Sequence, residues 1–184
     1  NALDIAGYTV DAQSKNVEIT TGTNEIIFYY TKRTDLEYTV NYYEEGTTNK
    51  LQESKTVEDQ TFGTAVTEEA VTISGYNLVS DESQTITIGA GENVINFYYA
   101  KKTNLSYTVK YLEERTNEKL ADEKTVEGQT FGTTVKETAI QINGYNVTGD
   151  SEKRLEIADG TNEIIFYYTK KNDLSYVVNY LEKD

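Results

Sequence analysis

The sequence predicts a mostly β protein (α+β) that is built from small tandem repeats. A Tyr-x-Val-x-Tyr motif begins at Tyr38, Tyr107 and Tyr176, so the motif returns every 69 residues. Within each copy apolar and polar residues alternate, which is typical of a half-buried strand. Because a fixed period of this length marks a repeat architecture, we expect each copy to fold as one unit, with about five strands and one short helix.

The period divides the chain into four segments. We expect a partial repeat over 1–37, full repeats over 38–106 and 107–175, and the first strand of a following repeat over 176–184. Fifteen of the 16 tyrosines occupy five positions that return in three copies, and Tyr43 is the exception. Since each unit of a repeat protein packs its own side chains, a ring that returns at one place is expected to lie in that unit's core.

The elements of one unit can be followed along the 107–175 copy. Alternation predicts the first strand, and the polar run after it predicts a turn, so that the second strand completes a hairpin. A short helix is predicted because Phe131, Val135 and Ala139 recur at helical spacing. Gly132 weakens this helix. In order, the elements are strands over 107–111 and 119–126, one or two helical turns within 131–139, and strands over 140–147, 155–157 and 162–169.

The link between neighbouring units is short and polar, and it contains neither Gly nor Pro. One apolar residue returns in each link, namely Leu36, Leu105 and Leu174. We expect these leucines to pack as wedges between adjacent repeats, because a lone apolar side chain in a polar segment gains free energy by burial. The units should then form an elongated, semi-rigid rod rather than a flexible string.

The composition excludes several classes of function. The chain carries 17 Lys and Arg against 31 Asp and Glu, a net charge of −14, and it has no His and no Cys. These absences exclude zinc fingers, haem and iron–sulfur ligation, His-dependent triads and a disulfide framework. Acidic surfaces suit neither nucleic acid nor anionic lipid, and no apolar run is long enough for membrane insertion. We therefore expect no enzyme activity and no cofactor, and the absence of Met indicates a piece of a longer protein.

Tyrosines that face outward are the candidate ligand-binding residues. In the closing Phe-Tyr-Tyr strand the first and third rings share one face, so the middle ring takes the other. These middle rings are Tyr29, Tyr98 and Tyr167. They could stack on sugar rings, and Tyr43, which lies outside the repeat pattern, is a further candidate. The alternative is ordinary pairing of side chains on a sheet surface.

Two acidic loops are candidates for calcium. Asp81 and Glu82 lie in one loop, and Asp150 and Glu152 lie in its copy. Calcium prefers clustered carboxylate oxygens, but neither loop has the spacing of an EF-hand. The alternative is a solvated acidic surface, and our main expectation is that the chain holds no metal.

Five motifs occur in a fixed order in the 107–175 copy and, with changes, in the other copies. They are Tyr-x-Val-x-Tyr, Lys-Leu, Lys-Thr-Val-x-Gly-Gln-x-x-Gly, Ile-x-Gly-Tyr and Asn-x-Ile-x-Phe-Tyr-Tyr. In this order they resemble the MucBP (mucin-binding protein) repeats of Gram-positive bacterial cell-surface adhesins. The resemblance implies a ubiquitin-like β-grasp fold, an extracellular place at the cell wall, mucin glycoprotein as the ligand and no catalytic residues. One departure is Asp59, which stands where the later copy has Gly128.

These observations leave two hypotheses about function. In the first, the repeats belong to a surface adhesin and bind mucin or other host glycans weakly and multivalently. In the alternative, the repeats are a stalk or filament that projects another domain. The filament could assemble head to tail, because 176–184 is an opening strand without its unit and 1–37 lacks one. The expected partners are therefore a glycan, neighbouring repeats and a second copy of the chain.

Overall fold

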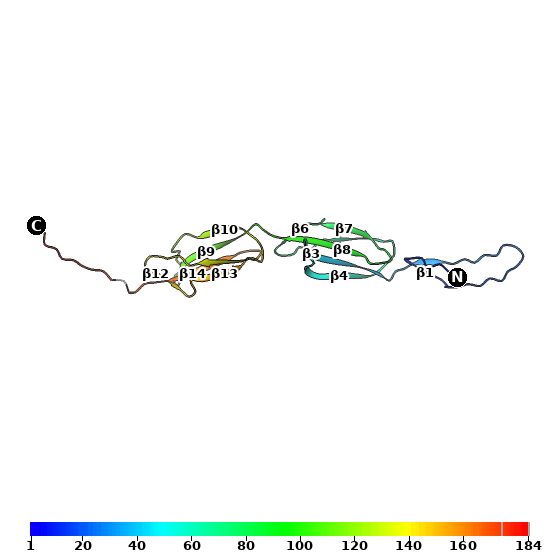
Figure 1. Ribbon diagram of the computed structural model, residues 1–184, viewed down its shortest axis with the longest axis horizontal. Coiled ribbons are helices and arrows are strands. Elements are labelled where there is room, and N and C mark those ends of the chain that lie inside the picture. Colours follow the sequence, from blue (N-terminus) through cyan, green and yellow to red (C-terminus); the bar gives the residue numbers. More distant parts are fainter. Residues whose placement is uncertain (174, 184) are drawn as a thin grey trace. The chain divides into compact units, whose positions relative to one another are not determined.

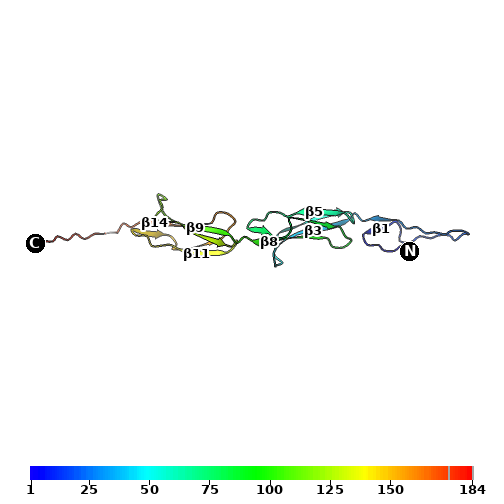
Figure 2. The ribbon, with the colours of Figure 1, turned by 90° about the horizontal axis from the view of Figure 1, so that it is seen from above.

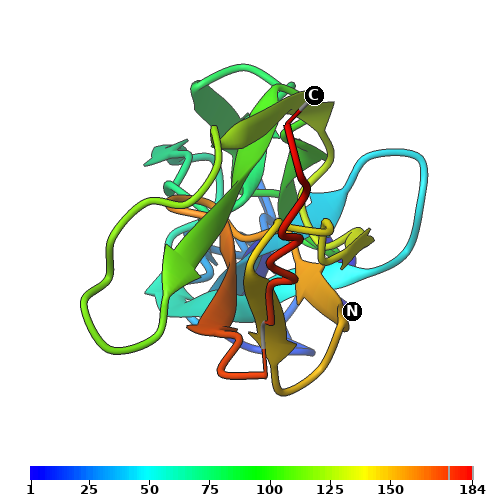
Figure 3. The same cartoon turned by 90° about the vertical axis from the view of Figure 1, so that its left-hand side faces the viewer.

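The computed structural model describes residues 1–173 and 175–183, and its regular elements are strands (Figure 1). The chain divides into two compact units, Asn1–Ala100 and Lys101–Asp184. The first unit holds a partial repeat and one full repeat, and the second holds the other full repeat. Figures 2 and 3 show the chain from two further directions, and neither shows a coiled ribbon among the described residues. The prediction of a mostly β protein made of small repeats is confirmed.

The first full repeat has six strands rather than about five. They are β3 (Leu36–Glu44), β4 (Lys50–Gln60), β5 (Ala65–Glu69), β6 (Tyr76–Leu78), β7 (Ser83–Thr87) and β8 (Val94–Lys101). Four of them form a sheet in the order β4-β3-β8-β6, and β5 pairs with β7 in a two-stranded ribbon. The opening strand β3 and the closing strand β8 are parallel neighbours. Parallel neighbours need a crossover connection, and the ribbon forms part of it here.

The second full repeat has the same architecture. Its strands are β9 (Leu105–Glu113), β10 (Lys124–Gln129), β11 (Thr134–Thr138), β12 (Tyr145–Thr148), β13 (Glu152–Glu156) and β14 (Glu163–Lys170). The sheet has the order β10-β9-β14-β12, and β11 pairs with β13. The partial repeat contributes an antiparallel pair, β1 (Tyr8–Val10) and β2 (Tyr30–Lys32).

The core of each full repeat lies on the inward faces of its opening and closing strands. In the first full repeat, Val40 and Tyr42 point inward from β3, as the alternation predicts. Phe97 of β8 is fully buried and stacks on Tyr42, with ring centroids 6.0 Å apart and planes inclined by 15°. Tyr111 and Phe166 repeat the stack in the second full repeat at 6.2 Å and 11°. The aromatic positions of Tyr42 and Phe97, and of their copies Tyr111 and Phe166, are therefore core positions.

The predicted helix over 131–139 is wrong. Thr134–Thr138 is strand β11, and it pairs antiparallel with β13. Its side chains alternate, so that Val135 and Glu137 are half-buried while the other three residues of the strand are exposed. Thr and Val are β-branched and favour extended backbone, and this preference prevails over the helical spacing of a few apolar residues. A β-grasp fold is not confirmed, because no described residue lies in a helix.

The Asp59 departure leaves the local backbone unchanged. Asp59 has a φ of 58° and Gly128 has a φ of 68°, so both adopt the left-handed conformation at the same turn of the repeat. Aspartate tolerates this region better than most residues, which explains how the exchange preserves the turn.

A buried asparagine holds the loop before the closing strand of each full repeat. Asn93 accepts a hydrogen bond from the N–H of Gly89 at 2.6 Å, and its amide donates to the carbonyls of Gly89 and Gly91 at 3.2 and 3.0 Å. The same amide donates to the carbonyl of Glu37 at 3.0 Å, so the loop is tied to β3. Asn162 repeats this arrangement in the second full repeat.

A hydrogen-bonded triad joins the sheet to the ribbon in each full repeat. The Tyr38 hydroxyl donates to Glu68 Oε1 at 2.6 Å, and Lys55 Nζ donates to the same oxygen at 2.7 Å. Burial opposes ionisation of Glu68, but the hydrogen bonds from Lys55 and Tyr38 outweigh it and lower the pKa of this carboxyl group. The hydrogen bond to Glu68, together with burial, raises the pKa of Tyr38 to about 12. The second full repeat contains the same triad, formed by Tyr107, Glu137 and Lys124.

Acid is expected to destabilise the full repeats through this triad. Because the folded-state pKa of Glu68 lies below its ordinary value of 4.5, its stabilisation is present above that pH and is lost as the pH falls through the folded-state pKa. Glu68→Gln should cost the 38–100 repeat about 1–2 kcal/mol at neutral pH and flatten its loss of stability in acid. Urea unfolding at a series of pH values measures both effects.

Glu69→Gln is the matched control for this prediction. Glu69 is the next residue of β5 and is exposed, so its substitution should change stability little at any pH. Equal acid sensitivity of Glu68→Gln and the parent chain would show that the triad does not carry the effect.

Candidate functional site

Two of the predicted candidate rings lie side by side on the first full repeat. Tyr43 of β3 and Tyr98 of β8 are opposite each other in the parallel pair. Their ring centroids are 6.2 Å apart and their planes are inclined by 29°, which is a stacked arrangement. Tyr98 is 39% exposed, whereas its neighbours Phe97 and Tyr99 are buried in the core. The pleat of β8 therefore directs one aromatic side chain to the outer surface between two core rings.

The hairpin turn after β3 adds polar walls to this aromatic pair. The chain leaves Tyr43, turns at Gly46 with a φ of 71°, and returns so that Lys50 pairs with Tyr43 across β3 and β4. A shallow groove of about 350 Å³ results. It is lined by Tyr43, Thr47, Thr48, Lys50 and Tyr98, which we call the tyrosine groove.

The polar groups of the tyrosine groove are positioned by their own hydrogen bonds. Thr47 Oγ1 donates to the carbonyl of Glu44 at 3.0 Å and accepts from the N–H of Asn49 at 3.0 Å. Lys50 Nζ donates to Ser54 Oγ at 2.7 Å, so one of its three N–H donors is engaged there. An aromatic floor with hydroxyl groups and an ammonium group beside it can hold a ligand that has one apolar face and a polar rim.

The other predicted rings do not join this groove. Tyr167 of β14 is half-buried and lies opposite Leu112 of β9, so the second full repeat has no tyrosine pair at this register. Tyr29 belongs to the partial repeat and is largely exposed, with Lys15 Nζ 5.4 Å from its ring centroid. The structure therefore brings together Tyr43 and Tyr98 alone among the four candidates.

Three groove residues were absent from the sequence prediction. Thr47, Thr48 and Lys50 belong to the predicted turn and second strand of the hairpin, and no local pattern marks them. Topology could have found them, because the strand that returns from a hairpin after Tyr43 must place its first residues next to that ring.

Leu36 and Leu105, two of the three link leucines, pack with the cores of their own repeats. Leu36 is the first residue of β3 and is only 6% exposed, within the core cluster of the first full repeat. Leu105 is half-buried against the core of the second full repeat, and Leu174 lies outside the described residues. The role of these leucines as wedges between repeats stays a prediction.

The predicted calcium loops contain few converging oxygens. Asp81 and Glu82 lie between β6 and β7, and Asp150 lies between β12 and β13. Glu152 forms ion pairs with Lys136 at 2.6 Å and Arg154 at 4.0 Å. Within residues 1–173 and 175–183, no three acidic side chains are placed to hold a metal ion. Calcium binding at these loops stays a prediction.

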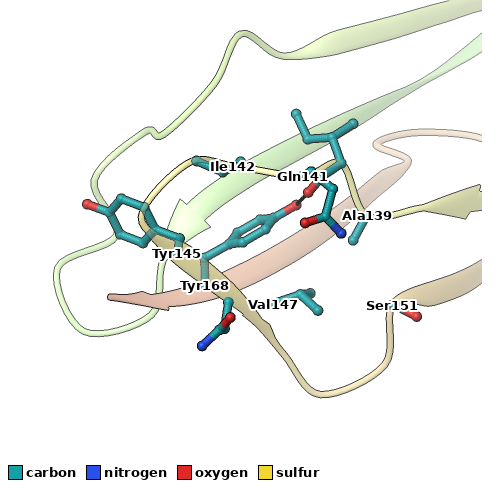
Figure 4. A pocket seen from close by; sticks show the side chains of 9 residues that line it. Ala139, Gln141, Ile142, Tyr145, Val147, Ser151 and Tyr168 are labelled. Atoms are coloured by element: carbon teal, nitrogen blue, oxygen red, sulfur yellow. Dashed lines mark hydrogen bonds between the residues drawn. The ribbon is translucent and has the colours of Figure 1, made fainter. Parts of the chain in front are cut away.

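A second hollow lies at the edge of the second full repeat (Figure 4). It measures about 260 Å³, and its lining includes Ala139, Ile142, Val147 and Tyr168. The Tyr168 ring is buried, and its hydroxyl donates to the carbonyl of Ile140 at 2.9 Å. The Tyr168 ring therefore offers a ligand neither an open aromatic face nor a free hydroxyl donor, in contrast to Tyr98 in the tyrosine groove.

In the described part of the chain, no helix reaches the length and apolarity that crossing a membrane requires.

Comparison with known proteins identifies the repeats. The family model described as the MucBP domain matches residues 1–31, 38–100 and 107–169. Internalin J of Listeria monocytogenes serovar 1/2a is 28% identical over 181 residues, which cover 94% of this chain and 21% of that protein. Internalin I of Listeria monocytogenes serotype 4b is 29% identical over 186 residues, which cover 95% of this chain and 10% of that protein. The chain thus spans about a fifth or less of the length of these curated relatives.

Solved structures give weaker similarities. The crystal structure of Mub-RV aligns with 73% of this chain and 98% of its own, at 13% identity and a TM-score of 0.30. The Bacillus anthracis TIE protein aligns with 80% of this chain and 38% of its own, at 10% identity and a TM-score of 0.41. The fold assignment therefore depends on the strands and their register.

Proposed function

The chain belongs to the MucBP domain family, and from that premise we propose that it is an extracellular repeat region of a bacterial surface adhesin. In this proposal the repeats stand at the cell wall or cell surface, and the tyrosine groove of the first full repeat binds mucin or another host glycan. The repeats have no catalytic role in this proposal. The family membership supports the location at the bacterial surface, and the tyrosine groove supports glycan binding.

The stacked pair of Tyr43 and Tyr98 is the observation that carries the proposal. A pyranose ring has a face of C–H groups that packs on an aromatic ring, and hydroxyl groups around its rim. In the groove the aromatic floor can receive that face, while Thr47, Thr48 and Lys50 offer hydrogen-bonding groups to the rim. A few convergent polar groups beside an apolar surface are the usual composition of a small-ligand site.

In this proposal the number of glycan sites is smaller than the number of repeats. The tyrosine pair occurs in the first full repeat, and Leu112 takes the place of Tyr43 in the second. A shallow groove of this kind is expected to bind a single glycan weakly. Strong attachment would then come from avidity, with many copies of the chain or of the repeat on one surface.

Binding to immobilised mucin and to a glycan array tests this function. Tyr43→Ser combined with Tyr98→Ser should weaken binding by about tenfold or more, because it removes both stacking faces. Tyr167→Ser is the matched control, since Tyr167 occupies the corresponding strand position opposite Leu112 and should leave binding unchanged. Equal binding by the double variant and the parent chain would contradict the proposed site.

The alternative proposal is a structural stalk. It is supported by the separate core clusters of the two full repeats, which suit a chain of self-sufficient units. Head-to-tail self-association by strand addition between copies of the chain belongs to this alternative. Absence of binding by the parent chain would favour the stalk, and a strictly monomeric chain in sedimentation would contradict self-association.

A further inference from the structure

The partial repeat meets the first full repeat at a turn whose backbone conformation and close packing favour glycine. Gly7 is buried and has a φ of 83°, in the left-handed region. The ring of Phe62 lies directly beside it, so that a Cβ built on Gly7 would fall 2.4 Å from Phe62 Cδ2. The ring of Tyr8, the next residue, contacts Phe62 edge to face, with centroids 5.5 Å apart and planes inclined by 64°.

Backbone hydrogen bonds tie the same three segments together. The N–H of Arg33, in the link, donates to the carbonyl of Gly7 at 2.9 Å. The N–H of Phe62 donates to the carbonyl of Arg33 at 2.9 Å. Gly63 also has a positive φ, 78°, and a Cβ there would lie 3.2 Å from Lys32 Nζ. The turn of one repeat, the link and a corner of the next repeat are thus held as one unit.

We propose that the Gly-Tyr turn (Gly7 and Tyr8) is an interaction surface whose partner is the Phe-Gly corner (Phe62 and Gly63) of the following repeat. The phenyl ring occupies the space that a side chain at Gly7 would need, and the Tyr8 ring contacts it edge to face. This contact couples the partial repeat to the full repeat. Leu36, for which the sequence predicts packing between repeats, lies in the core cluster of the full repeat, and its role as a wedge stays a prediction.

Gly144 provides an internal control for backbone strain. It is the sequence copy of Gly7 and has a φ of 81°, and its carbonyl accepts a 2.9 Å hydrogen bond from the N–H of Lys171, as the carbonyl of Gly7 does from Arg33. A Cβ built on Gly144 meets no atom within 4 Å. Alanine at the two positions therefore imposes a similar backbone penalty, and alanine at Gly7 adds a collision with Phe62.

Amide hydrogen exchange of the full chain tests the proposal. Gly7→Ala should accelerate exchange at the Arg33 N–H by at least about tenfold more than Gly144→Ala accelerates exchange at the Lys171 N–H. Phe62→Leu, which keeps an apolar side chain but removes the ring, should also accelerate exchange at Arg33. Exchange at Val40, in the core of the full repeat, should stay protected in these variants and so report that the repeat remains folded.

Two results would overturn the proposal. In the first, Gly7→Ala affects Arg33 no more than Gly144→Ala affects Lys171, so that backbone strain alone accounts for the change. In the second, Phe62→Leu leaves the protection of Arg33 intact, so that the ring does not hold the junction. If Phe62→Leu also removes the exchange protection of Val40, Phe62 acts by stabilising the core of the full repeat. That result would count equally against the proposal.

Discussion

Phe97→Ala is expected to lower the free energy of unfolding of the 38–100 repeat by about 3–5 kcal/mol. Phe97 lies at the centre of β8 with none of its surface exposed, and it stacks on Tyr42 across the parallel strand pair. Removal of the ring leaves a cavity that rigid neighbouring strands cannot fill. Because a domain of this size has little stability to spare, the repeat should be largely unfolded near its former melting temperature.

Residue-resolved hydrogen exchange measures this effect one repeat at a time. Protection should fall across β3 and β8, whereas β9 and β14 should keep theirs, because the second full repeat has its own core cluster. Phe28→Ala is the matched control: Phe28 is the copy of Phe97 in the partial repeat, is only half-buried, and should cost less than about 1 kcal/mol. Equal effects of the two substitutions would show that the stacked core does not set the stability of the repeat.

The core of these repeats was predictable because local periodicity determines it. Side chains two residues apart share a face of a strand, so Tyr107, Val109 and Tyr111 could be assigned together, and all three are buried. The 69-residue period then carries the assignment from one copy to the next. The helix over 131–139 failed for a related reason: Phe131, Val135 and Ala139 fit both the helical and the strand period, and the β-branched residues together with the pairing of β11 with β13 decide for the strand.

The candidate site was predictable only in part because it depends on a non-local register. Tyr98 could be named as an outward ring and Tyr43 as the one tyrosine outside the repeat pattern, but their contact exists only because the first and last strands of the repeat are parallel neighbours. No pattern within either strand specifies that pairing. Lys50 lies in the groove because the hairpin turn has the length that pairs it with Tyr43. The sequence predicts this turn but does not specify the strand register that follows it.

Asn93→Asp is expected to destabilise the 38–100 repeat by about 3 kcal/mol although it only replaces the amide NH2 group by an oxygen. The amide nitrogen of Asn93 donates to the carbonyls of Glu37, Gly89 and Gly91 at 3.0–3.2 Å. An aspartate oxygen in its place cannot donate, so those three carbonyls would face a buried negative charge. Only the bond from the N–H of Gly89 would survive, because it is accepted by the other oxygen.

The pH dependence separates this loss from a general weakening of the repeat. Repulsion by the carbonyls should raise the folded-state pKa of the introduced carboxyl group above its unfolded value of about 3.9. By linkage, the penalty is smallest below that value and grows as the pH rises through the folded-state pKa, which is the opposite of the acid sensitivity that Glu68 confers. Urea unfolding of Asn93→Asp should therefore approach the parent chain in acid and diverge from it towards neutral pH.

Asn24→Asp completes the comparison. Asn24 accepts from the N–H of Thr20 and donates to the carbonyls of Thr20 and Gly22, so it makes the same loop contacts at an exposed place in the partial repeat. Water can solvate its carboxylate and those carbonyls, so the penalty should stay below about 1 kcal/mol. A similar penalty at both positions would mean that the loop contacts carry the effect by themselves. A much larger penalty at Asn93, which alone reaches Glu37, assigns it to burial and to the bond that ties the closing loop to the opening strand.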